Sequence, residues 1–127
     1  MSGVNLTRQT TGAQPQIQRY GNGGFRVANA DYRGSVIVHP GGVIPWNVAA
    51  FGDLSLDTLA PVLALAGTVG VCLIGCGPKL LPIPLALRTK LKELGLPHDP
   101  MDTGAACRTY NVLAAESRAV AAALIAV

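Results

Sequence analysis

Residues 68–78 read TVGVCLIGCGP, a stretch that carries no charged side chain. Its apolar residues occupy consecutive positions instead of alternating ones, which is typical of a strand buried on both faces of a sheet. The glycines and the proline of residues 75–78 end the run as a loop. Because such a strand needs cover on both sides, the stretch predicts a layered α/β domain with helices on the faces of a mixed or parallel sheet.

Strand signals dominate the N-terminal half of the chain. Residues 17–20 and 25–28 are β-prone runs on either side of the turn signal GNGG, and together they predict an N-terminal β-hairpin. The β-branched run SVIV at residues 35–38 predicts a buried strand. A further short strand is expected at residues 43–46.

Two helices are expected on either side of the uncharged stretch. Ser55 is a suitable cap for a helix over residues 56–66, in which Pro61 marks either a tight first turn or the true helix start. A second helix is expected to open at Pro84 and to end at Gly95.

The C-terminal part of the chain contains one clear helix and one ambiguous segment. Asp102 or Thr103 is expected to cap a helix that runs through Ala115, after a short extended segment at residues 98–102. The alanines of residues 118–127 favour a helix, whereas the short length and two-faced apolarity of this segment fit a buried strand.

Composition limits the class of protein. With 127 residues, the chain is expected to form one domain over residues 14–127 after a flexible arm at residues 1–13. Only 13% of its residues are charged, about half the usual ~25%. Part of the surface is therefore apolar, which favours a protein partner or a homodimer.

Charge and hydropathy argue against two classes of partner. The net charge is only +3 and the ten Lys and Arg residues do not cluster along the sequence, so nucleic acid is not expected as a ligand. Residues 58–78 carry no charge, but Pro61, Gly67 and Gly70 divide them into pieces too short to span a membrane. We expect a cytoplasmic location in a bacterium, or a mitochondrial one in a eukaryote.

The cysteines and glycines do not complete a known cofactor motif. Three cysteines without regular spacing indicate a reducing compartment and not a disulfide framework. No cluster of His and Cys supplies the converging ligands of a metal site. Gly75 and Gly77 follow a strand, but Leu80 stands where a dinucleotide fingerprint needs its third glycine. We therefore expect no metal, no cofactor and no catalytic residue, and we favour a plain strand-to-helix turn.

Residues 102–118, DTGAACRTYNVLAAESR, are the richest in polar groups and admit two interpretations. In one, the helix start forms a pocket in which Arg108 holds an anion. In the other, which we favour, a buried polar network pins the helix to the sheet, with Glu116 or Asp102 paired to Arg108 or Arg118. The candidate residues of the site or network are Gly75, Gly77, Asp102, Thr103, Arg108, Tyr110, Asn111, Glu116 and Arg118.

Several motifs together resemble a small family of unknown function, first described from a methanobacterial hypothetical protein (the Mth-type domain). Its members include the mitochondrial complex I assembly factor three and an adipogenesis-associated protein. The resemblance rests on YGNGGF at 20–25, YRGSV at 32–36, Trp46, LIGCG at 73–77, ACRTYN at 106–111 and ESRAVAAAL at 116–124. The chain departs from the family at Cys76, where a small hydroxyl residue is usual, and at Ser117, where a glycine is common.

The resemblance implies a three-layer α/β/α domain on a five-stranded mixed sheet. Its last strand, within residues 118–127, is expected to run antiparallel to the others. For the mitochondrial relative it also implies a role in protein assembly. We therefore favour a non-enzymatic binding or assembly-helper module linked to respiratory complex I or membrane-protein assembly. The alternative is a small enzyme, or an anion- or metabolite-binding protein, that uses residues 75–78 and 108–111.

Overall fold

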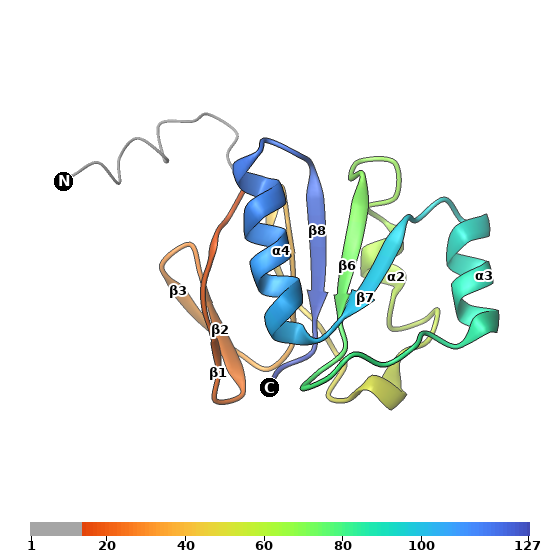
Figure 1. Cartoon of the computed structure of the whole chain (residues 1–127), viewed down its shortest axis with the longest axis horizontal. Coiled ribbons are helices and arrows are strands. Elements are labelled where there is room, and N and C mark those ends of the chain that lie inside the picture. The colour runs from red at the N-terminus through yellow and green to blue at the C-terminus, as the bar shows by residue number, and fades with distance from the viewer. Residues whose placement is uncertain (1–13) are drawn as a thin grey trace.

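The uncharged stretch forms β6, Val71–Gly75, an inner strand of a five-stranded mixed sheet (Figure 1). The computed structural model describes residues 14–127, and the arm expected at residues 1–13 lies outside them. The strand order is β5-β4-β8-β6-β7. The other four strands are β5 (Gly42–Pro45), β4 (Val36–His39), β8 (Val120–Leu124) and β7 (His98–Met101).

One strand of this sheet runs against the other four, as expected, but it is β4 and not the last strand. β8 is parallel to β6, and β6 is parallel to β7, whereas β4 is antiparallel to both β5 and β8. The expectation for the last strand is wrong because a helix connects β7 to β8, and such a crossover returns the chain in the same direction. A tight turn at Pro40 and Gly41 joins β4 to β5 and makes that pair antiparallel.

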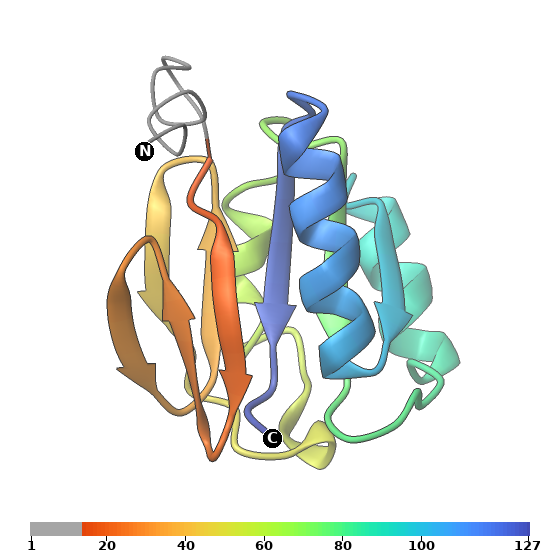
Figure 2. The same cartoon turned by 60° about the vertical axis from the view of Figure 1, so that its left-hand side comes forward.

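The five-stranded sheet is the middle one of three layers, which confirms the predicted α/β class (Figure 2). One face is covered by a helix together with a second, three-stranded antiparallel sheet: α4 (Thr103–Ala115), β1 (Ile17–Gly21), β2 (Gly24–Val27) and β3 (Ala30–Arg33). The opposite face is covered by short helices and loops: η1 (Phe51–Asp53), α2 (Ala60–Leu63) and α3 (Leu85–Glu93).

The sheet therefore has an apolar core on each side. Leu73 on β6 packs with Phe25 and Tyr110 toward the three-stranded sheet and α4. Its neighbour Ile74 packs on the opposite side with Trp46 and other buried side chains. Because successive strand residues point to opposite faces, the consecutive apolar residues of β6 serve both cores.

The predicted hairpin is confirmed but is extended by one strand. Asn22 and Gly23 both have positive φ angles, 53° and 78°, which are those of a type I′ turn between β1 and β2. Ala28 (φ 49°) and Asn29 (φ 70°) make a second such turn into β3. Alanine rarely adopts this conformation, so the sequence carried little sign of the second turn.

The helix expected over residues 56–66 is wrong for most of its length. Ser55 and Thr58 form a local turn, in which the Thr58 amide donates to Ser55 Oγ at 3.2 Å and the Thr58 hydroxyl donates to Asp53 O at 2.9 Å. The Leu59 amide also donates to Ser55 O at 3.0 Å, so Ser55 caps a single helical turn as expected. The regular helix α2 is shorter than expected, and Pro61 lies in its first turn. No helix within residues 14–127 is long and apolar enough to cross a membrane.

Candidate functional site

The predicted residues at the start of α4 lie at the junction of three elements. Asp102 is the N-cap, and its Oδ1 accepts from the Ala105 amide at 2.8 Å. Thr103 is fully buried, and its hydroxyl donates to Ile125 O at 2.7 Å and accepts from the Gly77 amide at 3.0 Å. One side chain thus joins α4 to the loop after β6 and to the chain after β8.

Gly75 at the end of β6 and Gly77 in the loop after it both have a structural role. A Cβ atom at Gly75 would lie 3.0 Å from Thr103 Oγ1 and 3.1 Å from Leu124 Cδ2, so a larger residue would push the helix away from the sheet. Gly77 has a φ of 107°, a conformation that other residues rarely adopt. The structure brings Gly75, Gly77 and Thr103 together as a closed junction. The Gly77 amide already donates to the Thr103 hydroxyl within it.

Tyr110 and Asn111, about two turns further along α4, hold the N-terminal segment. The buried Tyr110 hydroxyl donates to Pro15 O at 2.6 Å, and burial raises the pKa of this phenol to about 12. The Asn111 side chain accepts from the Ile17 amide at 2.9 Å and donates to Ile17 O at 2.7 Å. These bonds fasten β1 and the residues before it to the helix.

The remaining predicted residues do not join this network. Arg108, Glu116 and Arg118 are all exposed. Within residues 14–127 neither arginine forms an ion pair with Asp102 or Glu116, so that part of the prediction is wrong. The helix is pinned by the neutral side chains of Thr103, Tyr110 and Asn111 instead. The carboxylate of Asp102 caps the helix. Arg108 turns toward β1, where its Nη1 donates to the Tyr20 hydroxyl at 2.9 Å.

The three cysteines are buried and free. Burial raises the pKa of the Cys72 and Cys107 thiols to about 12, and it also raises the pKa of Cys76. All three therefore stay protonated near neutral pH, and a protonated thiol is a poor nucleophile and a poor metal ligand. In the described part of the chain no three His, Cys, Asp or Glu side chains lie together as a metal site requires.

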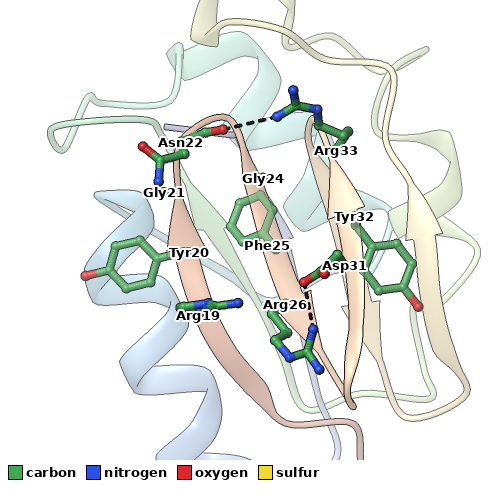
Figure 3. A pocket seen from close by; sticks show the side chains of 10 residues that line it. All are labelled: Arg19, Tyr20, Gly21, Asn22, Gly24, Phe25, Arg26, Asp31, Tyr32 and Arg33. Carbon is green, nitrogen blue, oxygen red and sulfur yellow. Dashed lines mark hydrogen bonds and ion pairs between the residues drawn. The ribbon is translucent and has the colours of Figure 1, made fainter.

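The outer face of the three-stranded sheet holds a shallow hollow of about 470 Å³ (Figure 3). The sequence did not predict a site there. Arg19 on β1 lies directly opposite Arg26 on β2, which in turn lies opposite Asp31 on β3. The next row of the same face contains Gly21, Gly24 and Arg33. The two glycines leave the floor of the hollow without side chains.

The charges around this hollow are only partly paired. Arg26 Nη1 lies 3.0 Å from Asp31 Oδ1, an exposed ion pair, and Arg33 Nη1 donates to Asn22 O at 3.4 Å, a long bond (Figure 3). Arg19 has no ion pair with any residue in the described range 14–127. Its guanidinium is thus available to a ligand.

A second hollow of about 270 Å³ continues the first one around β1. It lies between β1 and α4, and Arg19 and Tyr20 line both hollows. Arg108 and Asn111 line its α4 side. We call the combined region the arginine surface; it consists of Arg19, Tyr20, Arg26, Arg33 and Arg108.

The turn at Asn22 and Gly23 carried a sequence signal for the arginine surface. A two-residue turn at Asn22 and Gly23 places Arg19 opposite Arg26, and the chain repeats Arg at positions 19, 26 and 33, seven residues apart. Counting charges along the sequence could not show this, because the three arginines come together only through two successive hairpin turns.

Solved structures share the fold. A crystal structure described as an outer membrane protein from Bartonella henselae has a TM-score of 0.82 and 43% identity, over 90% of this chain and 96% of that one. A Bordetella pertussis protein described as an Mth938-like domain has a TM-score of 0.76 and 26% identity, over 92% of this chain and 88% of that one.

Curated relatives match by sequence. An uncharacterized Rhodobacter capsulatus protein is 41% identical over 114 residues, covering 90% of this chain and 86% of that protein. The NADH dehydrogenase (ubiquinone) 1 alpha subcomplex assembly factor 3 of Danio rerio is 30% identical over 122 residues, 96% of this chain and 70% of that protein. The human assembly factor 3 is 25% identical, and this chain spans 66% of its length.

These matches confirm the resemblance to the Mth-type family that the motifs indicated, and they extend it over nearly the whole domain. A family model described as protein of unknown function (DUF498/DUF598) matches residues 17–125, from β1 to the residue after β8. The chain belongs to this family of Mth938-like α/β domains.

Proposed function

We propose that this chain is a non-enzymatic binding module that helps to assemble the respiratory NADH dehydrogenase, complex I. The observation that carries the proposal is the match to assembly factor 3 of Danio rerio over 96% of this chain. The human and Drosophila melanogaster proteins of the same name also match over 96% of the chain. The relatives thus share the described domain itself.

The assembly factors are longer than this chain, which spans between 59% and 70% of their length. The proposal therefore assigns to this domain one role only, which is to bind a partner protein. That the chain forms a homodimer stays a prediction. The proposed location is the bacterial cytoplasm, or the mitochondrion in a eukaryote.

The geometry supports binding over catalysis. Arg and Tyr side chains are enriched among the residues that dominate protein interfaces, and Tyr20, with 40% of its surface exposed, lies in the middle of the arginine surface. The alternative needs residues 75–78 and 108–111 around one ligand. The Thr103 hydroxyl is bonded to the loop at Gly77, whereas Arg108 turns to β1, so one pocket does not contain both.

The test is to delete the gene in the organism that carries this chain. The amount of assembled NADH dehydrogenase is then measured on native gels, together with NADH:ubiquinone oxidoreductase activity in membranes. We expect both to fall while transcripts of the subunits are unchanged, and to recover when the gene is returned. A deletion strain that contains the normal amount of active complex would contradict the proposal.

A further inference from the structure

We infer that the arginine surface is the docking site for an acidic, extended segment of a partner protein. The inference deepens the proposed function, on which it rests for the statement that the partner is a protein. It concerns the outer face of β1–β3 and the groove beside α4, a region outside the closed junction at Thr103.

This region carries a net positive charge. Arg19, Arg26, Arg33 and Arg108 with Asp31 give the region a formal charge of +3, which equals the net charge of the chain. Of ten Lys and Arg residues six remain elsewhere, and of seven Asp and Glu residues six remain elsewhere. The rest of the chain is therefore balanced, and a negatively charged partner is attracted to this side.

The shape fits an extended chain. The row of Gly21 and Gly24 forms a trough with Arg19 and Arg26 along one side and Arg33 at its end. Gly24 cannot gain a side chain, because a Cβ atom there would collide with the backbone carbonyl of Tyr32. A peptide backbone in the trough would bring carboxylates on alternate residues within reach of the guanidinium groups, which bind carboxylates with two parallel hydrogen bonds.

Two features favour a protein over other polyanions. Asp31 lies among the arginines and is 73% exposed, so it repels a phosphodiester backbone, which is charged at every unit, whereas a peptide can place a neutral amide or hydroxyl donor opposite it and its carboxylates elsewhere. Stable anchoring to a membrane surface takes a second signal beside a basic patch, such as apolar side chains that insert beside the charges. The trough is floored by glycines, and Tyr20 is the one exposed large hydrophobic residue bordering it within residues 14–127.

The test uses the full chain and a fluorescein-labelled peptide of alternating glutamate and valine as the probe, with binding followed by fluorescence anisotropy at low ionic strength. The variant is Arg19→Glu with Arg33→Glu, both at exposed positions. The matched control is Arg88→Glu with Lys92→Glu on exposed positions of α3, which changes the net charge equally. We expect the first variant to bind on the order of tenfold more weakly or worse, and the control to bind like the wild type.

A second measurement locates the peptide without any substitution. Amide chemical-shift changes in the wild type are expected in β1–β3 and on the α4 side that carries Arg108. Equal loss of binding in both variants, or shift changes centred on α3, would overturn the inference. Tighter binding of the wild type to vesicles of anionic phospholipid, or to single-stranded DNA, than to the peptide would also overturn it.

Failure of the inference and failure of the proposed function give different results in cells. If the deletion strain loses assembled complex and the Arg19→Glu, Arg33→Glu chain restores it fully, the docking site is refuted and the assembly role stands. If the deletion strain assembles the complex normally, the assembly role is refuted, and the binding and shift measurements still decide the docking site.

Discussion

Replacing Thr103 by valine tests the closed junction between α4, the loop after β6 and the chain after β8. Valine has nearly the same shape as threonine, so the change removes the hydroxyl and keeps the packing. Two groups then lose their partner: the Gly77 amide, now bonded at 3.0 Å, and the Ile125 carbonyl, now bonded at 2.7 Å. Both residues are buried, so water does not readily replace the hydroxyl.

The expected cost follows from these two groups. A buried polar group that loses its only partner costs about 1–3 kcal/mol. With one acceptor and one donor both affected, Thr103→Val should lower the free energy of unfolding by about 2–4 kcal/mol. For a domain of this size that corresponds to a Tm lower by about 8–16 °C, at about 4 °C per kcal/mol.

The assay is urea unfolding followed by circular dichroism, with Thr103→Ser as the matched control. Serine keeps the hydroxyl and loses one methyl group, at a cost of about 1 kcal/mol. A packing role alone would rank serine below valine, whereas the hydrogen-bond account ranks valine below serine. A valine variant within about 0.5 kcal/mol of the wild type, or one more stable than the serine variant, would refute the reasoning.

Four further outcomes follow from the same contacts. Asn111→Ala should cost about 1–3 kcal/mol in urea unfolding because both bonds to the Ile17 backbone are lost, whereas Arg108→Ala should stay within about 0.5 kcal/mol; the reverse order would show that the arginine is the structural residue. Gly75→Ala should lower the Tm, since its Cβ would lie 3.0 Å from Thr103 Oγ1; an unchanged Tm would mean that the junction yields easily. Cys72 and Cys107 should react slowly with iodoacetamide at neutral pH, and fast, selective alkylation of one of them would contradict their burial. Because folding raises their pKa from 9.0 to about 12, the unfolded chain ionises first as pH rises. Stability should therefore fall above pH 9.0 by up to about 1.4 kcal/mol per pH unit for each thiol, and a flat profile under reducing conditions would be inconsistent with this.

Elements with a local signal could be predicted from the sequence. The consecutive apolar residues of β6 indicated a strand buried on both faces, and Asp102 marked the start of α4. The glycine and asparagine of residues 21–24 indicated the first hairpin turn. In each case the information lies within a few neighbouring residues, so backbone preference and burial pattern point to the same structure.

What depended on contacts between distant segments could not be predicted. The direction of β4 is set by its pairing with β8, which lies more than 80 residues away in the chain. The third strand, Ala30–Arg33, is exposed on most positions and follows a turn that contains Ala28. Ser55 and Thr58 form the expected cap, but the regular helix extends only over Ala60–Leu63.

The same division applies to the candidate site. Thr103, Tyr110 and Asn111 were among the candidate residues of a buried network, and all three belong to it. Their partners were not predicted, because Pro15 and Ile17 lie more than 90 residues earlier. The charged residues Arg108 and Glu116 were expected in the network but are exposed, because burial of an ion pair costs more than burial of neutral hydrogen-bonding groups.

The most direct test of the assembly role is a pulse-labelling experiment in the organism that carries this chain. Newly made proteins are labelled briefly, the tagged chain is purified at intervals, and labelled NADH dehydrogenase subunits are identified in the eluate. The account predicts that such subunits accompany the chain early in the chase and are gone from it once the mature complex has formed. If no NADH dehydrogenase subunit accompanies the chain at any interval, or if the chain stays bound to the mature complex, the assembly role is contradicted.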